Sequence, residues 1–230
     1  METLNNIVLT IQNYMSNYVL IIALLGAGLW FSFRLGFIQV RGFGEGMRRT
    51  FGGLFSKKGE AGADGMSSFQ ALATAIAAQV GTGNIAGAAT ALAIGGPGAI
   101  FWMWIAAFLG MATIYAEAIM AQKYKTVGAD GQVTGGPVYY IRAAFKGTFG
   151  KVLAGIFAIL ITLALGFMGN AVQSNSIAAS FHTAFGIPQW IMGLVVAVIA
   201  IFVFMGGMKR IAKVTETIVP FMAALYIIGS

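Results

Sequence analysis

Long windows of this sequence carry no Asp, Glu, Lys or Arg, and one of them covers all of residues 152–180. A helix needs about 20 apolar residues to cross a hydrocarbon layer of about 30 Å. Charged residues make up 9% of the chain and hydrophobic residues 58%, whereas about a quarter of the residues in a soluble domain are charged. The sequence therefore excludes a water-soluble globule and predicts helices that span a membrane.

Windows of roughly this length predict an all-α, polytopic membrane protein with about six transmembrane helices. The first window is short enough to be tilted or partly interfacial. The six windows are residues 18–33, 69–94, 99–122, 152–180, 189–205 and 214–230.

The basic residues are confined to alternate connections between these windows. All 14 Lys and Arg lie in residues 34–68, 123–151 and 206–213. The N-terminal tail, the turn at 95–98 and the loop at 181–188 carry none. Cytoplasmic connections are the ones rich in Lys and Arg, so we expect a multi-pass protein of the plasma (inner) membrane with its N-terminus outside. An anionic inner leaflet then accounts for the net charge of +7, and nucleic acid is not an expected partner.

The first basic connection contains an amphipathic segment at residues 40–55. Aromatic and Met side chains recur there every fourth residue, while three Arg lie at other positions. This pattern is typical of a helix on the inner membrane surface. The glycines of the segment leave a mobile basic loop as an open alternative.

The second window is interrupted in its middle by Gly81, Thr82, Gly83 and Asn84. Such residues weaken a helix by about 0.5 to 1 kcal/mol each relative to Ala, and an unpaired amide in hydrocarbon costs several more. Irregular backbone at membrane depth is tolerated where it lines a cavity, and it offers N–H groups to a carboxylate and carbonyls to a cation. We therefore predict a broken helix that binds a ligand. The alternative is a packing face of small residues with the Gly-x-x-x-Gly spacing, formed by Gly83 and Gly87.

An enzyme is a weaker interpretation of the same residues. The glycines of residues 81–87 superficially match a dinucleotide fingerprint, but no strand pattern precedes them and residues 100–109 hold no acid for a ribose. No predicted span contains a Ser-His-Asp set, paired carboxylates or a cluster of metal ligands, and the chain has no Cys. We therefore expect neither an enzyme nor a cofactor.

Polar residues in two other windows are further candidates. Asn170 and Gln173 share one face of the fourth predicted span, one turn after Phe167. A polar seam between helices is the alternative for this face. Glu117 lies deep within the third predicted span, where a carboxylate costs on the order of 2.5 kcal/mol or more and so needs a partner.

Four specific runs are spread along the chain: RLGFIQVRGF at 34–43, VGTGNIAGAATALAIGGPGAIFWMW at 80–104, DGQVTGGPVYYI at 130–141 and QSNSIA at 173–178. Together they closely resemble the sodium:alanine or glycine symporter family, the alanine/glycine:cation symporters, and the resemblance extends over nearly the whole chain. VGTGN also looks like the unwound first helix of the leucine-transporter fold. The resemblance implies an N-terminal helix and basic cytoplasmic linker at 1–67. It implies the first five-helix repeat of an inverted-repeat fold at 68–230, so that the chain is expected to be the N-terminal half of a longer protein.

The function implied by the resemblance is sodium-coupled symport of alanine or glycine by alternating access, as part of a longer chain. An uncoupled or proton-coupled transporter or channel, or a non-transporting fragment, stays open as an alternative. The resemblance implies sodium ligation by the carbonyls of Ala77 and Val80, and bracing by Glu117, with proton coupling as the alternative for Glu117. The substrate-binding residues it implies are Gln79, Gly81, Thr82, Gly83, Asn84, Phe167, Asn170 and Gln173. For Gln79 and Asn84, bracing of the backbone is the alternative to ligand contact.

Overall fold

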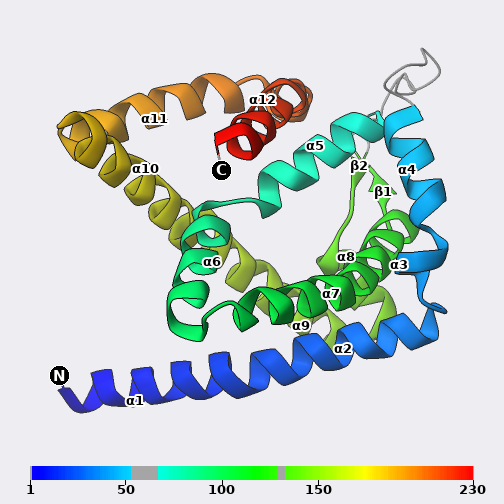
Figure 1. The fold of residues 1–230 in the computed structure, drawn as a ribbon. Coiled ribbons are helices and arrows are strands. Elements are labelled where there is room, and N and C mark those ends of the chain that lie inside the picture. The colour runs from blue at the N-terminus through cyan, green and yellow to red at the C-terminus, as the bar shows by residue number, and fades with distance from the viewer. Residues whose placement is uncertain (1, 53–66, 129–132, 230) are drawn as a thin grey trace. The chain divides into compact units, whose positions relative to one another are not determined.

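A computed structural model describes residues 2–52, 67–128 and 133–229 of the chain (Figure 1). These residues form helices and one short hairpin, and they divide into two compact units. The first unit comprises residues 1–46 and 91–123, and the second comprises residues 47–90 and 124–230. The boundary predicted at residue 67 from the resemblance remains a prediction.

The first unit is built from long apolar helices. Three successive segments, α1, η1 and α2, run on without interruption, and η1 is a short π-helical stretch. The unit also holds the end of α6 and the beginning of α4. Its elements are α1 (Glu2–Tyr14), η1 (Met15–Val19), α2 (Leu20–Arg34), α3 (Ile38–Arg41), part of α4 (Phe43–Gly52), part of α6 (Thr82–Gly95) and α7 (Gly98–Lys123).

A close contact between α2 and α7 forms the core of the first unit. A Cβ atom placed on Gly28 would lie 2.8 Å from Cβ of Leu109, so glycine permits this approach. Ser32, one turn later, is fully buried, and its hydroxyl donates to the carbonyl of Gly28 at 2.7 Å. Ser32 Oγ also accepts a hydrogen bond of 2.6 Å from Nε2 of Gln39, which follows the turn after α2. Nε2 of Gln39 also donates to the carbonyl of Phe108 on α7 at 3.3 Å. Small residues and the side chain of Gln39 therefore connect α2, α3 and α7.

The second unit contains the remaining helices and the hairpin. Helix α5 packs on α12, α8 on α9, α10 on α11, and α11 on α12. Helices α9 and α10 are joined through the π-helical segment η3. The elements are α5 (Ser68–Gln79), most of α6, β1 (Thr126–Val127), β2 (Val133–Thr134), α8 (Pro137–Ala144), α9 (Thr148–Ile161), η3 (Thr162–Gly169), α10 (Asn170–Phe185), α11 (Gln189–Phe204) and α12 (Gly207–Gly229).

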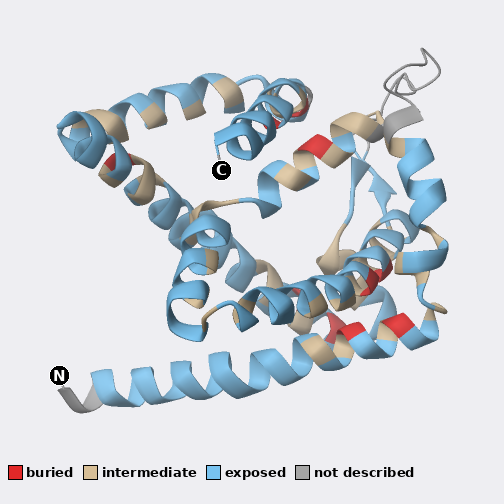
Figure 2. Ribbon diagram, viewed as in Figure 1, coloured by how far each residue is buried: buried red, intermediate tan, exposed pale blue. Residues whose placement is uncertain are grey.

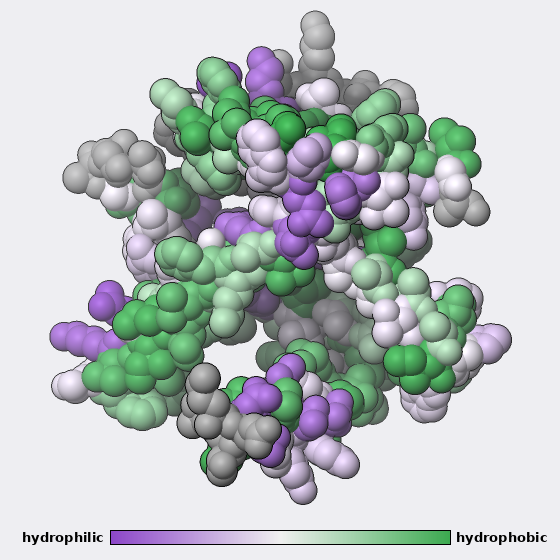
Figure 3. Space-filling view, turned by 90° about the vertical axis from the view of Figure 1, so that its left-hand side faces the viewer, coloured by the Kyte–Doolittle hydropathy of each residue, from purple (hydrophilic) through white to green (hydrophobic). Residues whose placement is uncertain are grey.

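Little of the described chain is buried, and what is buried is small (Figure 2). The buried hydrophobic residues among those described are Ala73, Ala112, Ala116, Ala154, Ala178, Ala212 and Val219. Large apolar side chains lie on the outer faces of the helices, as the hydrophobic areas in Figure 3 show. Membrane helices contact one another through small residues and turn large apolar ones to lipid. The pattern is that of an integral membrane protein, and the predicted all-α membrane class is confirmed.

The helices follow the six predicted windows, with differences in extent. Within the described residues, four helices are long and apolar enough to cross a membrane: residues 5–34, 98–123, 148–185 and 210–229. The first predicted window, 18–33, is shorter than the helix, which extends over residues 5–34. Polar residues before position 18 lower the hydropathy of the sequence there, although they lie within the helix. Helix α11 is a shorter apolar helix. The count of six spans and the five-helix repeat remain predictions.

The amphipathic segment predicted at 40–55 is helical where the structure describes it. Its residues fall in α3 and α4, with Gly42 between them, and residues 53–55 lie outside the described residues. The placement of this segment on the inner membrane surface remains a prediction.

Candidate functional site

The predicted interruption of the second window is present, and it lies at Val80 and Gly81. Helix α5 makes its last backbone bond from Val80 N–H to the carbonyl of Ile76 at 2.8 Å. Val80 then turns into an extended conformation, with φ −92° and ψ 107°. Thr82 already belongs to α6. The break is therefore slightly earlier than predicted, because Thr82, Gly83 and Asn84 form the first turn of the next helix.

The N–H groups after the break point away from α5. The N–H of Gly81 donates to Oδ1 of Asn84 at 3.4 Å, and the N–H of Thr82 donates to Oε1 of Gln173 at 3.1 Å. Asn84 N–H bonds to the carbonyl of Gly81 at 3.0 Å. Side-chain oxygens thus accept hydrogen bonds from two of the N–H groups that have no helical partner at the beginning of α6.

The same bonds leave carbonyls of α5 without their helical partners. In a continuous helix, the carbonyl of Ala77 would accept from the N–H of Gly81, and that of Val80 from the N–H of Asn84. Both N–H groups are bonded elsewhere. Ala77 and Val80, the predicted sodium ligands, are therefore residues whose carbonyl oxygens the break releases from the helical ladder.

Gln173 is brought to the break from α10. Its amide lies so close to Gly81 that a Cβ atom on Gly81 would overlap it. Gly81 and Thr82 are half-buried, while Gln173 is exposed. The structure thus joins two groups of residues that were predicted separately, the break and the polar face of α10.

Neighbours of Gln173 on the predicted polar face are placed differently. The side-chain nitrogen of Asn170 donates to the carbonyl of Gly166 at 3.0 Å, within its own helix. This bond fits a bracing role for Asn170. Phe167 belongs to η3, and its side chain is 67% exposed. Its predicted role at the site remains a prediction.

The π-helical segment η3 was not predicted. It ends at Gly169, immediately before α10 begins at Asn170. Segments of this kind occur frequently at functional sites, because they widen the helix and leave backbone groups free. The pair Gly166 and Gly169, three residues apart in an apolar run, was the available signal for an irregularity there.

The other predicted residues are Gln79, Gly83 and Glu117, of which the first two have open surroundings and the third lies in the first unit. Gln79, the last residue of α5, is exposed. Within the described part of the chain, a Cβ atom on Gly83 or Gly87 would meet nothing within 4 Å. The close approach expected of a small-residue packing face is therefore not seen at these two glycines. Glu117 is half-buried on α7, in the first unit, and its bracing role remains a prediction.

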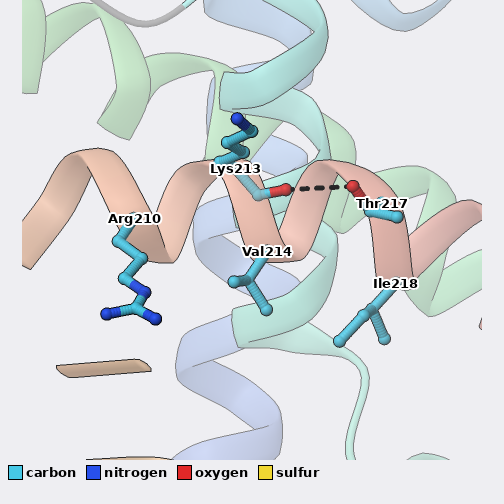
Figure 4. Close-up of a pocket in the computed structure, with 5 residues that line it drawn as sticks. All are labelled: Arg210, Lys213, Val214, Thr217 and Ile218. Carbon is cyan, nitrogen blue, oxygen red and sulfur yellow. Dashed lines mark hydrogen bonds between the residues drawn. The ribbon is translucent and has the colours of Figure 1, made fainter. Parts of the chain in front are cut away.

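A separate open pocket lies along α12 (Figure 4). Arg210, Val214 and Ile218 extend from one side of the helix in this view, while Thr217 donates a hydrogen bond of 3.2 Å to the carbonyl of Lys213. None of the predicted site residues lines this pocket. The break, not this pocket, is therefore the candidate site.

The electrostatics of the break suit a ligand that carries both charges. The negative end of the α5 dipole and the positive end of the α6 dipole meet at Val80 and Gly81. Residues 77–84 contain no ionisable side chain, and neither do Asn170 and Gln173. Such a site offers N–H groups to a carboxylate and carbonyl oxygens to a cation without a fixed charge of its own.

Comparison with known proteins shows the family of the chain. The model of the sodium:alanine symporter family matches residues 1–230. The sodium/alanine symporter AgcS of Methanococcus maripaludis is 44% identical over 97% of this chain and 49% of its own length. A putative sodium/proton-dependent alanine carrier protein, YrbD of Bacillus subtilis, is 48% identical over 90% of this chain and 41% of its own length. A probable sodium/glutamine symporter of the same organism, GlnT, is 42% identical over 98% and 46%.

This chain spans about half the length of the relatives that it matches. The match nevertheless covers every residue of the chain, and the family is one of transporters, which is not a class of enzymes. The broken helix and the apolar helices are therefore parts of an integral membrane protein of this family. The chain belongs to the sodium:alanine symporter family.

Proposed function

We propose that this chain forms part of a sodium-coupled symporter for a small neutral amino acid, alanine or glycine, that works by alternating access as part of a longer chain. The observation that carries the proposal is the break at Val80 and Gly81, where two helix ends of opposite dipole meet. The names of the relatives support amino acids and sodium as a class. Alanine or glycine as the substrate is the narrower part of the proposal.

The substrate carboxylate would bind the N–H groups at the beginning of α6. In the structure, Oε1 of Gln173 takes the N–H of Thr82, and an amide oxygen is a neutral counterpart of a carboxylate oxygen. A substrate would therefore either displace Gln173 from Thr82 or share the donors with it. The N–H of Gly81, bonded to Asn84 at the long distance of 3.4 Å, is the weaker bond and the readier donor.

The sodium ion and the substrate amino group would lie on the α5 side of the break. Sodium would be held by the carbonyl oxygens of Ala77 and Val80, which the break releases. Two carbonyls do not complete a coordination shell, so further oxygens would come from elsewhere in the protein or from the substrate. Gln79 would contact the substrate or brace the unwound backbone.

The protein would lie in the plasma membrane with its N-terminus outside. The confinement of Lys and Arg to alternate connections supports this orientation. Sodium would then enter from the side on which it is concentrated, together with the amino acid.

The function is tested by uptake of labelled alanine into proteoliposomes that contain the purified longer protein of which this chain is proposed to be a part. With an inward sodium gradient, we expect alanine to accumulate above its external concentration, and we expect no accumulation when choline replaces sodium. Accumulation that persists in choline would contradict sodium coupling, and dependence on a pH gradient would indicate proton coupling. Equilibration without accumulation would indicate a channel.

The site is tested by a matched pair of glycine variants. Gly83→Leu and Gly87→Leu both place a side chain in open space on α6, but Gly83 lies in the first turn, beside the break, and Gly87 lies one turn further on. We expect Gly83→Leu to abolish alanine binding and Gly87→Leu to retain it, while both remain folded. Equal affinity in the two variants would move the site away from the break.

A further inference from the structure

Helix α5 is held in place by something other than continuity with α6. The backbone hydrogen bonds of α5 end at Val80, which is extended, so they do not continue into α6. Among the described elements, α5 makes its main contact with α12 (Figure 1). Both helices carry a buried small residue, Ala73 on α5, which is 2% exposed, and Ala212 on α12, which is 3% exposed.

Two side-chain hydrogen bonds cross this contact. Nε2 of Gln70 donates to Oε2 of Glu216 at 2.9 Å, and both groups are partly buried. One turn further along α5, the hydroxyl oxygens of Thr74 and Thr215 lie 3.1 Å apart. Thr215 also donates its hydroxyl to a backbone carbonyl at 2.9 Å, so Thr74 is the donor in the pair. We call these four residues the α5–α12 seam.

Gln70 joins the seam to the beginning of α5. Its Oε1 accepts from the N–H of Ser67 at 3.1 Å, while Ser67 Oγ accepts from the N–H of Gln70 at 3.1 Å. This reciprocal capping box works equally well with Glu at the position of Gln70. A Glu there, however, has no N–H group to offer Glu216. Capping alone therefore does not require Gln rather than Glu at position 70, whereas the bond to Glu216 does.

The same bond explains how a carboxyl group is accommodated at Glu216 on α12. Glu216 is the single acidic residue of α12, and a carboxylate in a spanning helix is costly unless it has a partner. The Gln70 amide supplies that partner without a second charge. A hydrogen bond to an ionised acceptor is about twice as strong as one between neutral groups, so this bond dominates the seam.

We propose that Gln70 and Glu216 are positioning residues, which hold α5 against α12 and thereby fix where the carbonyls of Ala77 and Val80 point. The inference rests on the proposed function, because it assigns the pair a role in presenting the sodium and substrate site. Loss of the Gln70–Glu216 bond frees α5 to move about the joint at Val80. The site at the break then loses its fixed geometry while the rest of α12 remains in place.

The test measures the distance between α5 and α12 in the purified protein in lipid nanodiscs. Because the chain contains no Cys, spin labels at Ala71→Cys and Thr217→Cys need no removal of native thiols, and both positions are exposed. We expect a narrow distance distribution in the otherwise unchanged protein. In Gln70→Glu, which keeps the capping box but places two carboxylates together, we expect a broader distribution and a longer mean distance.

The matched controls are Glu216→Gln and the swapped pair Gln70→Glu/Glu216→Gln. The first keeps an acceptor for Gln70, and the second restores a carboxylate-to-amide bond in the reverse direction. We expect both to give the narrow distribution. We expect alanine affinity to fall about tenfold in Gln70→Glu, which corresponds to the loss of one charged hydrogen bond, and to recover in the swapped pair.

An unchanged distribution in Gln70→Glu, or failure of the swapped pair to restore it, would overturn the proposal. Should Gln70→Glu fail to fold, Thr74→Val removes the second bond of the seam. Thr183→Val is its control, because Thr183 is exposed on α10 and its hydroxyl donates to the carbonyl of Ala179 within its own helix. A distance distribution equal to that of the control would again overturn the proposal. Failure of the proposed function is distinguishable, because a protein that binds no alanine still reports its α5–α12 distance.

Discussion

The backbone N–H of Thr82 donates a hydrogen bond of 3.1 Å to Oε1 of Gln173, 91 residues further along the chain. The donor belongs to the first turn of α6, and the acceptor comes from the first turn of α10. A broken helix in a membrane requires partners for the backbone groups that it exposes. Here one partner is a side chain from a different helix, which ties the break to α10.

Removal of the Gln173 amide should destabilise the protein. Gln173→Leu leaves the N–H of Thr82 without its acceptor, and an unsatisfied donor that is partly shielded from water costs about 1 to 3 kcal/mol. We expect the free energy of unfolding in mixed micelles to fall by that amount. Gln122→Leu, an equivalent change at an exposed position on α7, is the control and should leave stability within about 0.5 kcal/mol of the original. Equal effects in the two variants would show that Gln173 does not satisfy Thr82.

Two alanine substitutions on either side of the first turn of α6 should have opposite effects. A Cβ atom on Gly81 overlaps the Gln173 amide, whereas a Cβ atom on Gly87 meets open space. We expect Gly81→Ala to lower the free energy of unfolding by about 1 kcal/mol, because the end of the Gln173 side chain must move away and its hydrogen bond to the N–H of Thr82 is lost. Gly87→Ala should raise it by up to about 1 kcal/mol through helix propensity. Circular dichroism during unfolding measures both, and a stabilising Gly81→Ala would contradict the contact.

The break could be predicted from local sequence because its cause is local. Two glycines with Thr82 and Asn84 in an apolar window weaken the helix wherever it packs, and the structure interrupts the helix at Val80 and Gly81. The position differed slightly because Asn84 Oδ1 accepts the N–H of Gly81. That bond favours an early beginning of α6, and hydropathy does not reveal it.

Contacts between distant residues could not be predicted in the same way. The polar face of α10 was recognisable from the spacing of Asn170 and Gln173, but spacing does not say which residue faces the break. The structure gives Asn170 a partner within its own helix and sends Gln173 to Thr82. The bond between Gln70 and Glu216 depends in the same way on tertiary packing, across 146 residues.

Tyr139, outside the candidate spans, should ionise at a lower pH than an ordinary tyrosine. Its hydroxyl lies 2.9 Å from Oγ1 of Thr134, which in turn lies 3.1 Å from Oγ1 of Thr126. The hydrogen bond between Tyr139 and Thr134 is the largest cause that lowers the pKa of Tyr139, and Thr126 and the charge of Arg142 lower it further. Absorbance titration of the unchanged protein, with Tyr139→Phe subtracted, measures the pKa. We expect it below the usual value of about 10.

The lowered pKa of Tyr139 also predicts how the stability of the protein changes with pH. Because the pKa of Tyr139 is lower in the folded state, the unfolded state binds more protons between the folded and unfolded values, and stability from this group rises with pH through that window. The stabilisation from Tyr139 is lost as the pH falls through the pKa that this residue has in the folded state. Thr134→Val should return the pKa toward about 10, whereas Thr134→Ser should not. A pKa that Thr134→Val leaves unchanged would contradict the assignment of its cause.

The contact between α2 and α7 should depend on glycine at one position and tolerate a side chain at another. A Cβ atom on Gly28 would lie 2.8 Å from Cβ of Leu109, while one on Gly26 meets nothing within 4 Å among the described residues. We expect Gly28→Ala to lower the free energy of unfolding by about 1 to 3 kcal/mol, because both helix backbones are close and neither can yield easily. Gly26→Ala, two residues earlier on α2, should be neutral or stabilise by up to about 1 kcal/mol. Unfolding in mixed micelles measures both, and a Gly28→Ala protein as stable as Gly26→Ala would show that α2 and α7 do not pack this closely in the membrane protein.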